Sequence, residues 1–164
     1  MTNLEMKVDA LARVITAADE ETRKAALAEL TELLSLGEQE IDRQEDRDYF
    51  MDVTKVLNKL GVSTSILGYG YLRDAILLAI RNPKKLRKMT SGFYPEVGKL
   101  NNTTGNKVER AIRHAIEVCW YRGDIEMLES YFGNTVSPDK GKPTNREFIS
   151  LVAEKVRMYG AAIN

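Results

Sequence analysis

The chain has 164 residues, of which 43% are hydrophobic, and its 24 Lys and Arg balance 24 Asp and Glu. This size and apolar content predict one folded globular domain, or one domain with an appendage, and exclude a disordered chain. No run approaches the ~18 apolar residues of a membrane span, and no secretory leader is visible. A single Cys and a single His exclude the usual zinc sites, so we expect a cytoplasmic protein without metal or cofactor.

The charges are unevenly distributed along the chain. Residues 1–52 carry six basic and fourteen acidic side chains, a net charge of −8, whereas residues 81–114 carry nine and two, a net charge of +7. Binding to DNA depends on the local field at the contact surface. The neutral total therefore does not exclude a nucleic-acid partner.

The N-terminal third shows helical periodicity over residues 3–15 and 19–36, and Gly37 is the expected end of the second helix. Residues 38–48 are almost wholly charged and predict a solvated helical or flexible linker. We place a domain boundary there, between a helical extension over residues 1–48 and a domain over residues 49–164. The extension could form a hairpin, bind a partner chain or pack on its own domain.

Two helices are expected next, over residues 49–60 and 65–81, and the stretch Ser63–Ser65 could cap the second of them. The second is apolar around most of its circumference and predicts the central core helix. Gly68 and Gly70 within it predict a close helix crossing, because no strand precedes them as a phosphate-binding loop would require. Asn82-Pro83 should end this helix and begin another.

A short helix, FYPEVGKL, is followed by a polar turn and a longer helix over residues 104–122. The longer helix has one apolar side and one basic side, and Thr103, Thr104 or Asn106 can cap it, the last with Glu109 in a capping-box variant. Its predicted buried side consists of Val108, Ala111, Ile112, Ala115, Ile116 and Cys119. A short helix, a turn and a longer helix with a basic outer face are typical of a DNA-binding helix-turn-helix.

Two further helices are predicted near the end of the chain. Asp124 should cap the first, with Ile125, Leu128 and Phe132 pointing inward. A polar loop follows, and the segment 144–147 is a full capping box that opens the last helix.

No part of the sequence indicates an enzyme. His114 has no visible partners for a catalytic triad, and Cys119 on an apolar face is expected to be an inert small hydrophobic residue. No carboxylate pair or phosphate-binding glycine loop is apparent.

Four segments carry a resemblance to a known family: GYGYLRDAI, YPEVGKLNNTT, KVERAIRHAIEVCWYRG and FGNTVSPDKGKPTNREFISLVAEKVR. From about Tyr49 to Met158 the chain resembles the C-terminal effector domain of the stage-zero sporulation response regulators, transcription factors of endospore formation. The resemblance implies an all-α, compact six-helix domain with a helix-turn-helix. It also implies dimers that bind tandem TGTCGAA-like boxes in double-stranded DNA.

The resemblance further implies roles for individual residues. The base-reading positions are Lys107, Glu109, Arg110 and Arg113, and Asn106 and His114 match positions near the DNA backbone. Independently of the resemblance, we expect Thr104 and Lys99 to contact phosphates, with the basic cluster Lys84–Lys88 as a further candidate. The family usually has Ser and Arg in place of Asn106 and Lys107, so we expect a shifted base preference, because Lys cannot reproduce a guanidinium fork. The segment that would meet the RNA polymerase sigma subunit contains Asp124, Met127, Phe132 and Asn134.

The front of the chain departs from the family pattern, which includes a receiver domain of roughly 120 residues. Residues 1–48 are too short and too helical for a receiver, and no phosphoacceptor aspartate can be assigned. Either the chain lacks phosphorelay control or a helical module replaces the receiver. A second hypothesis is an interaction protein, a decoy that binds the full-length regulator or another protein through its N-terminal helices. The acidic segment could also mask the basic surface.

Overall fold

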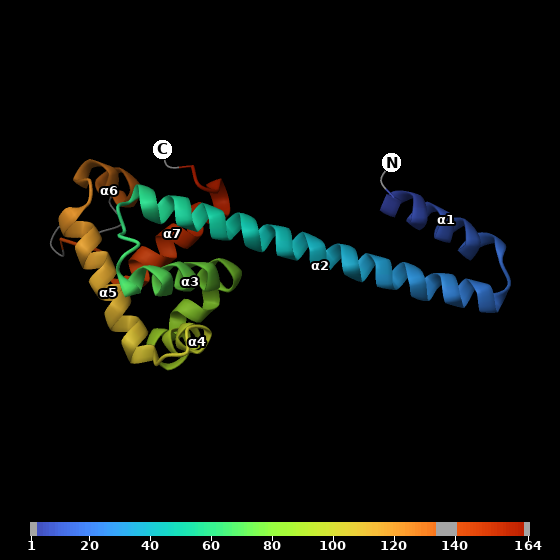
Figure 1. Cartoon of the computed structure of the whole chain (residues 1–164), viewed down its shortest axis with the longest axis horizontal. Helices are drawn as coiled ribbons and strands as arrows, with labels where there is room; N and C mark the ends of the chain where they lie inside the picture. The colour runs from blue at the N-terminus through green and yellow to red at the C-terminus, as the bar shows by residue number, and fades with distance from the viewer. Residues whose placement is uncertain (1–2, 134–140, 163–164) are drawn as a thin grey trace. The chain divides into compact units, whose positions relative to one another are not determined.

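A computed structural model describes residues 3–133 and 141–162, which form helices and no strands (Figure 1). The α-helices are α1 (Asn3–Ala17), α2 (Glu20–Lys59), α3 (Leu67–Arg81), α4 (Tyr94–Leu100), α5 (Gly105–Arg122), α6 (Ile125–Phe132) and α7 (Asn145–Tyr159). A 3₁₀ helix, η1 (Pro83–Lys88), and a π-helical turn, η2 (Met89–Phe93), connect α3 to α4. The prediction of an all-α fold is confirmed.

The chain divides into two units, Met1–Arg47 and Asp48–Asn164. The first contains α1 and the first part of α2, joined at Asp19. The carboxylate of Asp19 accepts hydrogen bonds from the backbone N–H of Thr22 at 2.9 Å and of Glu21 at 3.1 Å. These hydrogen bonds lower the pKa of Asp19, and the bond from Thr22 has the largest effect. They also satisfy N–H groups at the start of α2 that have no partner within the helix.

The prediction that a helix ends at Gly37 is wrong, because α2 continues from Glu20 to Lys59. Residues 38–48 are helical and exposed, which agrees with the helical form of the predicted linker. A single Gly in a helix costs only about 1 kcal/mol relative to Ala. The charged stretch after it contains mostly Glu, Gln and Arg, which are good helix formers. No Pro and no residue with positive φ interrupts it.

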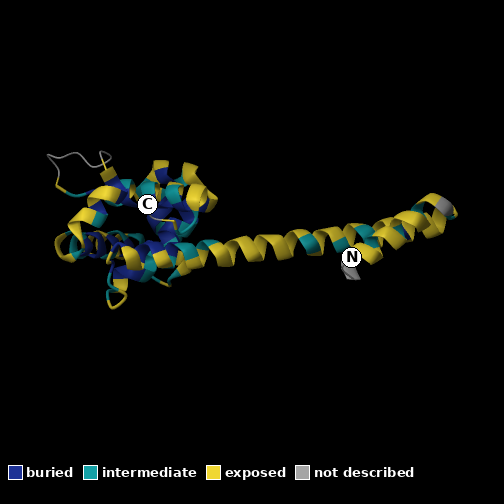
Figure 2. Cartoon of the chain, turned by 90° about the horizontal axis from the view of Figure 1, so that it is seen from above, coloured by how far each residue is buried: buried dark blue, intermediate teal, exposed yellow. Residues whose placement is uncertain are grey.

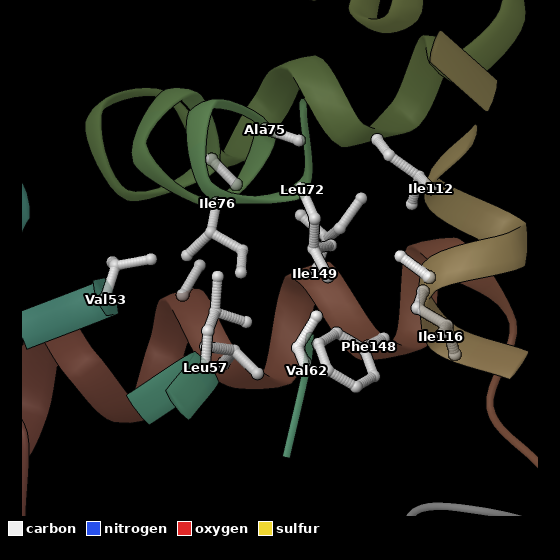
Figure 3. Packing of buried hydrophobic residues seen from close by; sticks show 14 of the residues in the cluster. Val53, Leu57, Val62, Leu72, Ala75, Ile76, Ile112, Ile116, Phe148 and Ile149 are labelled. Atoms are coloured by element: carbon white, nitrogen blue, oxygen red, sulfur yellow. The ribbon is translucent and has the colours of Figure 1, made fainter. Parts of the chain in front are cut away.

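The core of the second unit lies around α3, which packs against both α5 and α7. Figure 3 shows Leu72 and Ile76 of α3 close to Ile149 of α7, with Ile112 and Ile116 of α5 beside them. The end of α2 closes the core with Val53 and Leu57, both fully buried. Six α-helices therefore build the described part of this unit, namely the end of α2 and α3 to α7, as expected.

One of the two glycines in α3 marks a close helix crossing. A Cβ atom on Gly68 would lie 2.0 Å from the carbonyl oxygen of Ala111 in α5, whereas one on Gly70 would meet nothing within 4 Å. The backbones of α3 and α5 thus touch at Gly68. The prediction of a close crossing is confirmed for Gly68 and wrong for Gly70.

Thr144 and Glu147 form the predicted capping box of α7. The predicted serine cap of α3 is wrong, because Ile66 stands at that position and Ser63 and Ser65 bond to each other. Ile125 is 64% exposed, not inward, because it directly follows the cap residue Asp124 and the inner face of α6 begins at Leu128.

Among the described residues, no helix is both long and apolar enough to cross a membrane.

Gly68→Ala should destabilise the second unit by about 1–3 kcal/mol, because the added methyl group meets the backbone of α5. Gly70→Ala is the matched control and should stabilise it by about 0.5–1 kcal/mol, because Ala lowers the entropy of the unfolded chain and has room in the fold. Urea unfolding followed by the fluorescence of Trp120, the only tryptophan, measures both. Equal effects of the two substitutions would contradict the close crossing.

Candidate nucleic-acid interface

The turn between α4 and α5 is tight because its backbone folds back onto the end of α4. The N–H of Thr103 donates to the carbonyl of Gly98 at 2.9 Å, and Asn102 takes a left-handed conformation with φ of 51°, which Asn tolerates better than most residues. A Cβ on Gly98 would lie 2.7 Å from the carbonyl oxygen of Thr103. Gly98 therefore permits the turn that sets the angle between the two helices.

Two further contacts fix this turn on the rest of the domain. The side-chain amide of Asn101 donates to the carboxylate of Asp74 in α3 at 2.9 Å and to the carbonyl of Val97 at 3.0 Å. Gly105, the first residue of α5, lies so close to α4 that a Cβ would be 2.8 Å from the nitrogen of Pro95. The start of α5 is thus held by both α3 and α4.

Thr104 caps α5, and its hydroxyl accepts from the N–H of Lys107 at 3.4 Å. The alternative capping box of Asn106 and Glu109 is not formed, because the helix already begins at Gly105. The buried side of α5 is as predicted, except that Ala111 is only half-buried. Cys119 lies within it, and burial raises the pKa of its thiol to about 11, so the thiolate is disfavoured.

The opposite side of α5 gathers most of the predicted DNA-contacting residues on one exposed surface. The exposed residues of this surface are Asn106, Lys107, Arg110, Arg113 and His114. Thr104 at the cap and Lys99 near the end of α4 are also exposed. We call these seven residues the basic surface.

Glu109 lies at the edge of the basic surface and, unlike the residues of that surface, is acidic and half-buried. Its carboxylate pairs with the guanidinium of Arg113 one turn later, and the side chains are 25% and 60% exposed. A pair this exposed contributes little to stability. Its effect is to hold the Arg113 guanidinium along the helix.

Asn145 at the start of α7 is a positioning residue that the sequence interpretation did not identify. Its side-chain amide donates to the hydroxyl of Tyr94 in α4 at 3.1 Å and to the backbone carbonyl of Glu109 in α5 at 3.2 Å. Burial raises the pKa of Tyr94, so its hydroxyl stays protonated. Asn145 belongs to the quoted KPTN stretch, but the sequence showed there only a helix cap.

A hollow of about 420 Å³ opens beside this junction. Its charged lining is mixed in sign, with Glu109, Arg113, Glu117, Lys142 and Arg146. Lys142 pairs with Glu117, and this hydrogen bond lowers the pKa of Glu117. Within the described residues, no group of three or more His, Cys, Asp or Glu is arranged to hold a metal ion.

The residues predicted to meet a polymerase subunit are not all at the surface. Asp124 is exposed and caps α6, accepting from the N–H of Met127 at 3.1 Å, and Met127 is half-buried. Phe132 is only 2% exposed and packs in the core, so its side chain is not available to a partner. Asn134 lies outside the described residues.

Residues 53–156 match the family described as "Sporulation initiation factor Spo0A C terminal". The chain belongs to this family. The match covers the helix-turn-helix and the core that holds it, and it confirms the resemblance found in the sequence. The Spo0A C-terminal family comprises DNA-binding regulators of sporulation initiation.

Asn145→Ala should destabilise the second unit by about 1–3 kcal/mol, because it removes two hydrogen bonds and leaves a buried hydroxyl and a carbonyl without this donor. Arg146→Ala is the matched control at the next, exposed position and should change stability by less than about 0.5 kcal/mol. Urea unfolding of both variants provides the comparison. A neutral Asn145→Ala would show that the junction does not depend on this amide.

Proposed function

We propose that this chain is a regulator that reads a specific sequence in double-stranded DNA, a TGTCGAA-like box, by placing α5 in the major groove. The observation that carries the proposal is the basic surface, which lies mainly on α5, a helix held in place by contacts with α3, α4 and α7. The major groove is wide enough for one helix. A rigid support is needed because base reading requires accurate placement of side chains.

Base reading is assigned to Lys107, Glu109, Arg110 and Arg113. An Arg can bind guanine through O6 and N7 with two parallel hydrogen bonds, and a Glu can accept from the amino group of cytosine. Glu109 and Arg113 are already paired, so they would meet the bases as a unit. Lys107 supplies a positive charge but lacks the two parallel N–H donors of an arginine, so it discriminates less between bases.

The DNA backbone would be held by Asn106, His114, Thr104 and Lys99 around these residues. All four are exposed, and their N–H and O–H groups can donate to phosphate oxygens. The net charge of +7 on residues 81–114 supports this assignment. Lys85 is less free to contribute, because it pairs with Glu96 at 2.5 Å.

The proposal includes two partners besides DNA. A homodimer on tandem boxes is inferred from the family resemblance. The RNA polymerase sigma subunit is proposed to meet the start of α6, where Asp124 is exposed next to Ile125 and close in sequence to Tyr121, which is 80% exposed. Phe132 is excluded from this surface by its burial.

Arg110→Ala should weaken binding to box DNA by about 1–3 kcal/mol and reduce the preference for the box over a scrambled duplex. Arg122→Ala removes the same side chain from the last turn of the same helix, outside the basic surface, and should leave both quantities nearly unchanged. Fluorescence anisotropy at fixed salt measures them. If wild type binds box and scrambled DNA equally, the proposed function fails.

Lys99→Ala should weaken binding to box and scrambled DNA alike, because phosphate contacts carry no sequence information. The slope of log affinity against log salt should fall by about 1 in magnitude. Lys59→Ala, at an exposed lysine in the last turn of α2, is the control and should leave the slope unchanged. An unchanged slope for Lys99→Ala would remove this residue from the interface.

A further inference from the structure

The first unit has helices but almost no core of its own. Among the described side chains of Met1–Arg47, only Ala26 is buried. In Figure 2 the helices of this unit are coloured almost entirely as exposed or intermediate. Helices in proteins gain most of their stability from packing an apolar face. The apolar side chains of this unit therefore indicate a surface that a partner covers.

These side chains form a regular row on α2. Leu27, Leu34 and Ile41 follow one another at seven-residue intervals and are 46%, 56% and 62% exposed. A seven-residue repeat places side chains along one side of a helix, as in helices that pair with one another. The row exists because α2 runs unbroken through Gly37.

The first helix covers a different face of α2. Within this unit α1 folds back along the first part of α2 (Figure 1). The more buried positions of α2 there are Ala26, Leu30, Leu33 and Gly37. Their spacing of four, three and four residues defines a face beside the row. The row itself thus remains exposed after α1 has packed.

The charges at the ends of the row identify the partner. Arg23 lies four residues before Leu27 and Glu45 four residues after Ile41, so the pattern is symmetric about Leu34 and has opposite charges at its two ends. Both charged residues are exposed and lie on the same side of the helix as the row. Arg23 uses one nitrogen to donate to the carbonyl of Ala18, and its other N–H groups remain for a partner.

We propose that the row binds a second copy of this chain in antiparallel orientation. Leu34 then meets its own counterpart, Leu27 meets Ile41, and Arg23 meets Glu45 at both ends. This is the self-complementary contact that a two-fold dimer requires. A parallel pair would instead place Arg23 against Arg23 and Glu45 against Glu45.

Several of the remaining acidic residues lie away from this contact, although Glu20, seven residues before Leu27, extends the row at its N-terminal end. Residues 1–47 carry six basic and twelve acidic side chains, so two copies repel each other unless the acids avoid the contact. Glu29, Glu32 and Glu40 lie on other faces of α2. Glu38 lies at the edge of the row, where its carboxylate remains in water. With α1 from each copy, the dimer forms four helices around one apolar centre.

The proposal does not rest on DNA binding. If DNA binding also holds, the dimer brings a second helix-turn-helix to the same duplex at high effective concentration.

The first test measures the dimer dissociation constant of the intact chain by sedimentation equilibrium without DNA. Leu34→Gln should raise this constant by about tenfold or more. Leu36→Gln is the matched control, because Leu36 is 53% exposed on the same helix but points away from the row, and it should leave the constant unchanged. A wild type that stays monomeric at every concentration, or equal effects of the two variants, would overturn the proposal.

The second test determines orientation and does not depend on removing an apolar side chain. Arg23→Glu or Glu45→Arg alone should raise the dissociation constant roughly three- to tenfold, because each creates two like-charge contacts. The double variant Arg23→Glu/Glu45→Arg should return it close to the wild-type value at the same salt. Only antiparallel pairing predicts this rescue, and its absence would overturn the antiparallel dimer.

Discussion

The position of α5 depends on a contact between two backbones. Gly68 carries no side chain, so α3 and α5 approach until the peptide of Ala111 fills the space where a Cβ would stand. Because α3 also packs against α7, this contact connects α5 to the centre of the core. A side chain at position 68 would move α5 and, with it, every residue of the basic surface.

Side-chain hydrogen bonds add a second constraint on the position of α5. The core determines how close α5 lies to α3, and directional polar contacts add to this constraint. Asn101 binds Asp74 at one end of the junction, and Asn145 binds Tyr94 and the backbone of Glu109 at the other. Since hydrogen bonds are directional, the bond from Asn145 to the carbonyl of Glu109 restricts the rotation of α5 about its own axis, and so which of its side chains are exposed.

Much of this arrangement could be predicted from the sequence, because it depends on local signals. The helical class, the limits of α5 and the capping box at Thr144 follow from spacing and from residues within one turn of each other. The continuity of α2 was not predicted, since a lone Gly in a charged stretch is compatible with either a stop or a continuing helix.

Other features depend on neighbours distant in the chain. Gly68 and Gly70 look alike in sequence, and only the position of Ala111 distinguishes them. From the sequence, Asn145 could be interpreted only as part of a helix cap. Its hydrogen-bond partners Tyr94 and Glu109 are 51 and 36 residues away, so no local pattern indicates them. Two predictions were made for Phe132. Helix periodicity predicted that it is buried, which is correct. The family resemblance alone assigned it to a partner surface, which its burial excludes.

The junction at Asn145 also has a consequence for how the protein is made. The chain leaves the ribosome from its N-terminus, so α4 and α5 emerge before α7. Until residue 145 is synthesised and α7 forms, Tyr94 and the carbonyl of Glu109 lack their amide partner, and α5 lacks one wall of its core. A nascent or truncated chain that already contains the whole helix-turn-helix sequence therefore does not yet present the finished basic surface, which is completed only when the last helix has formed.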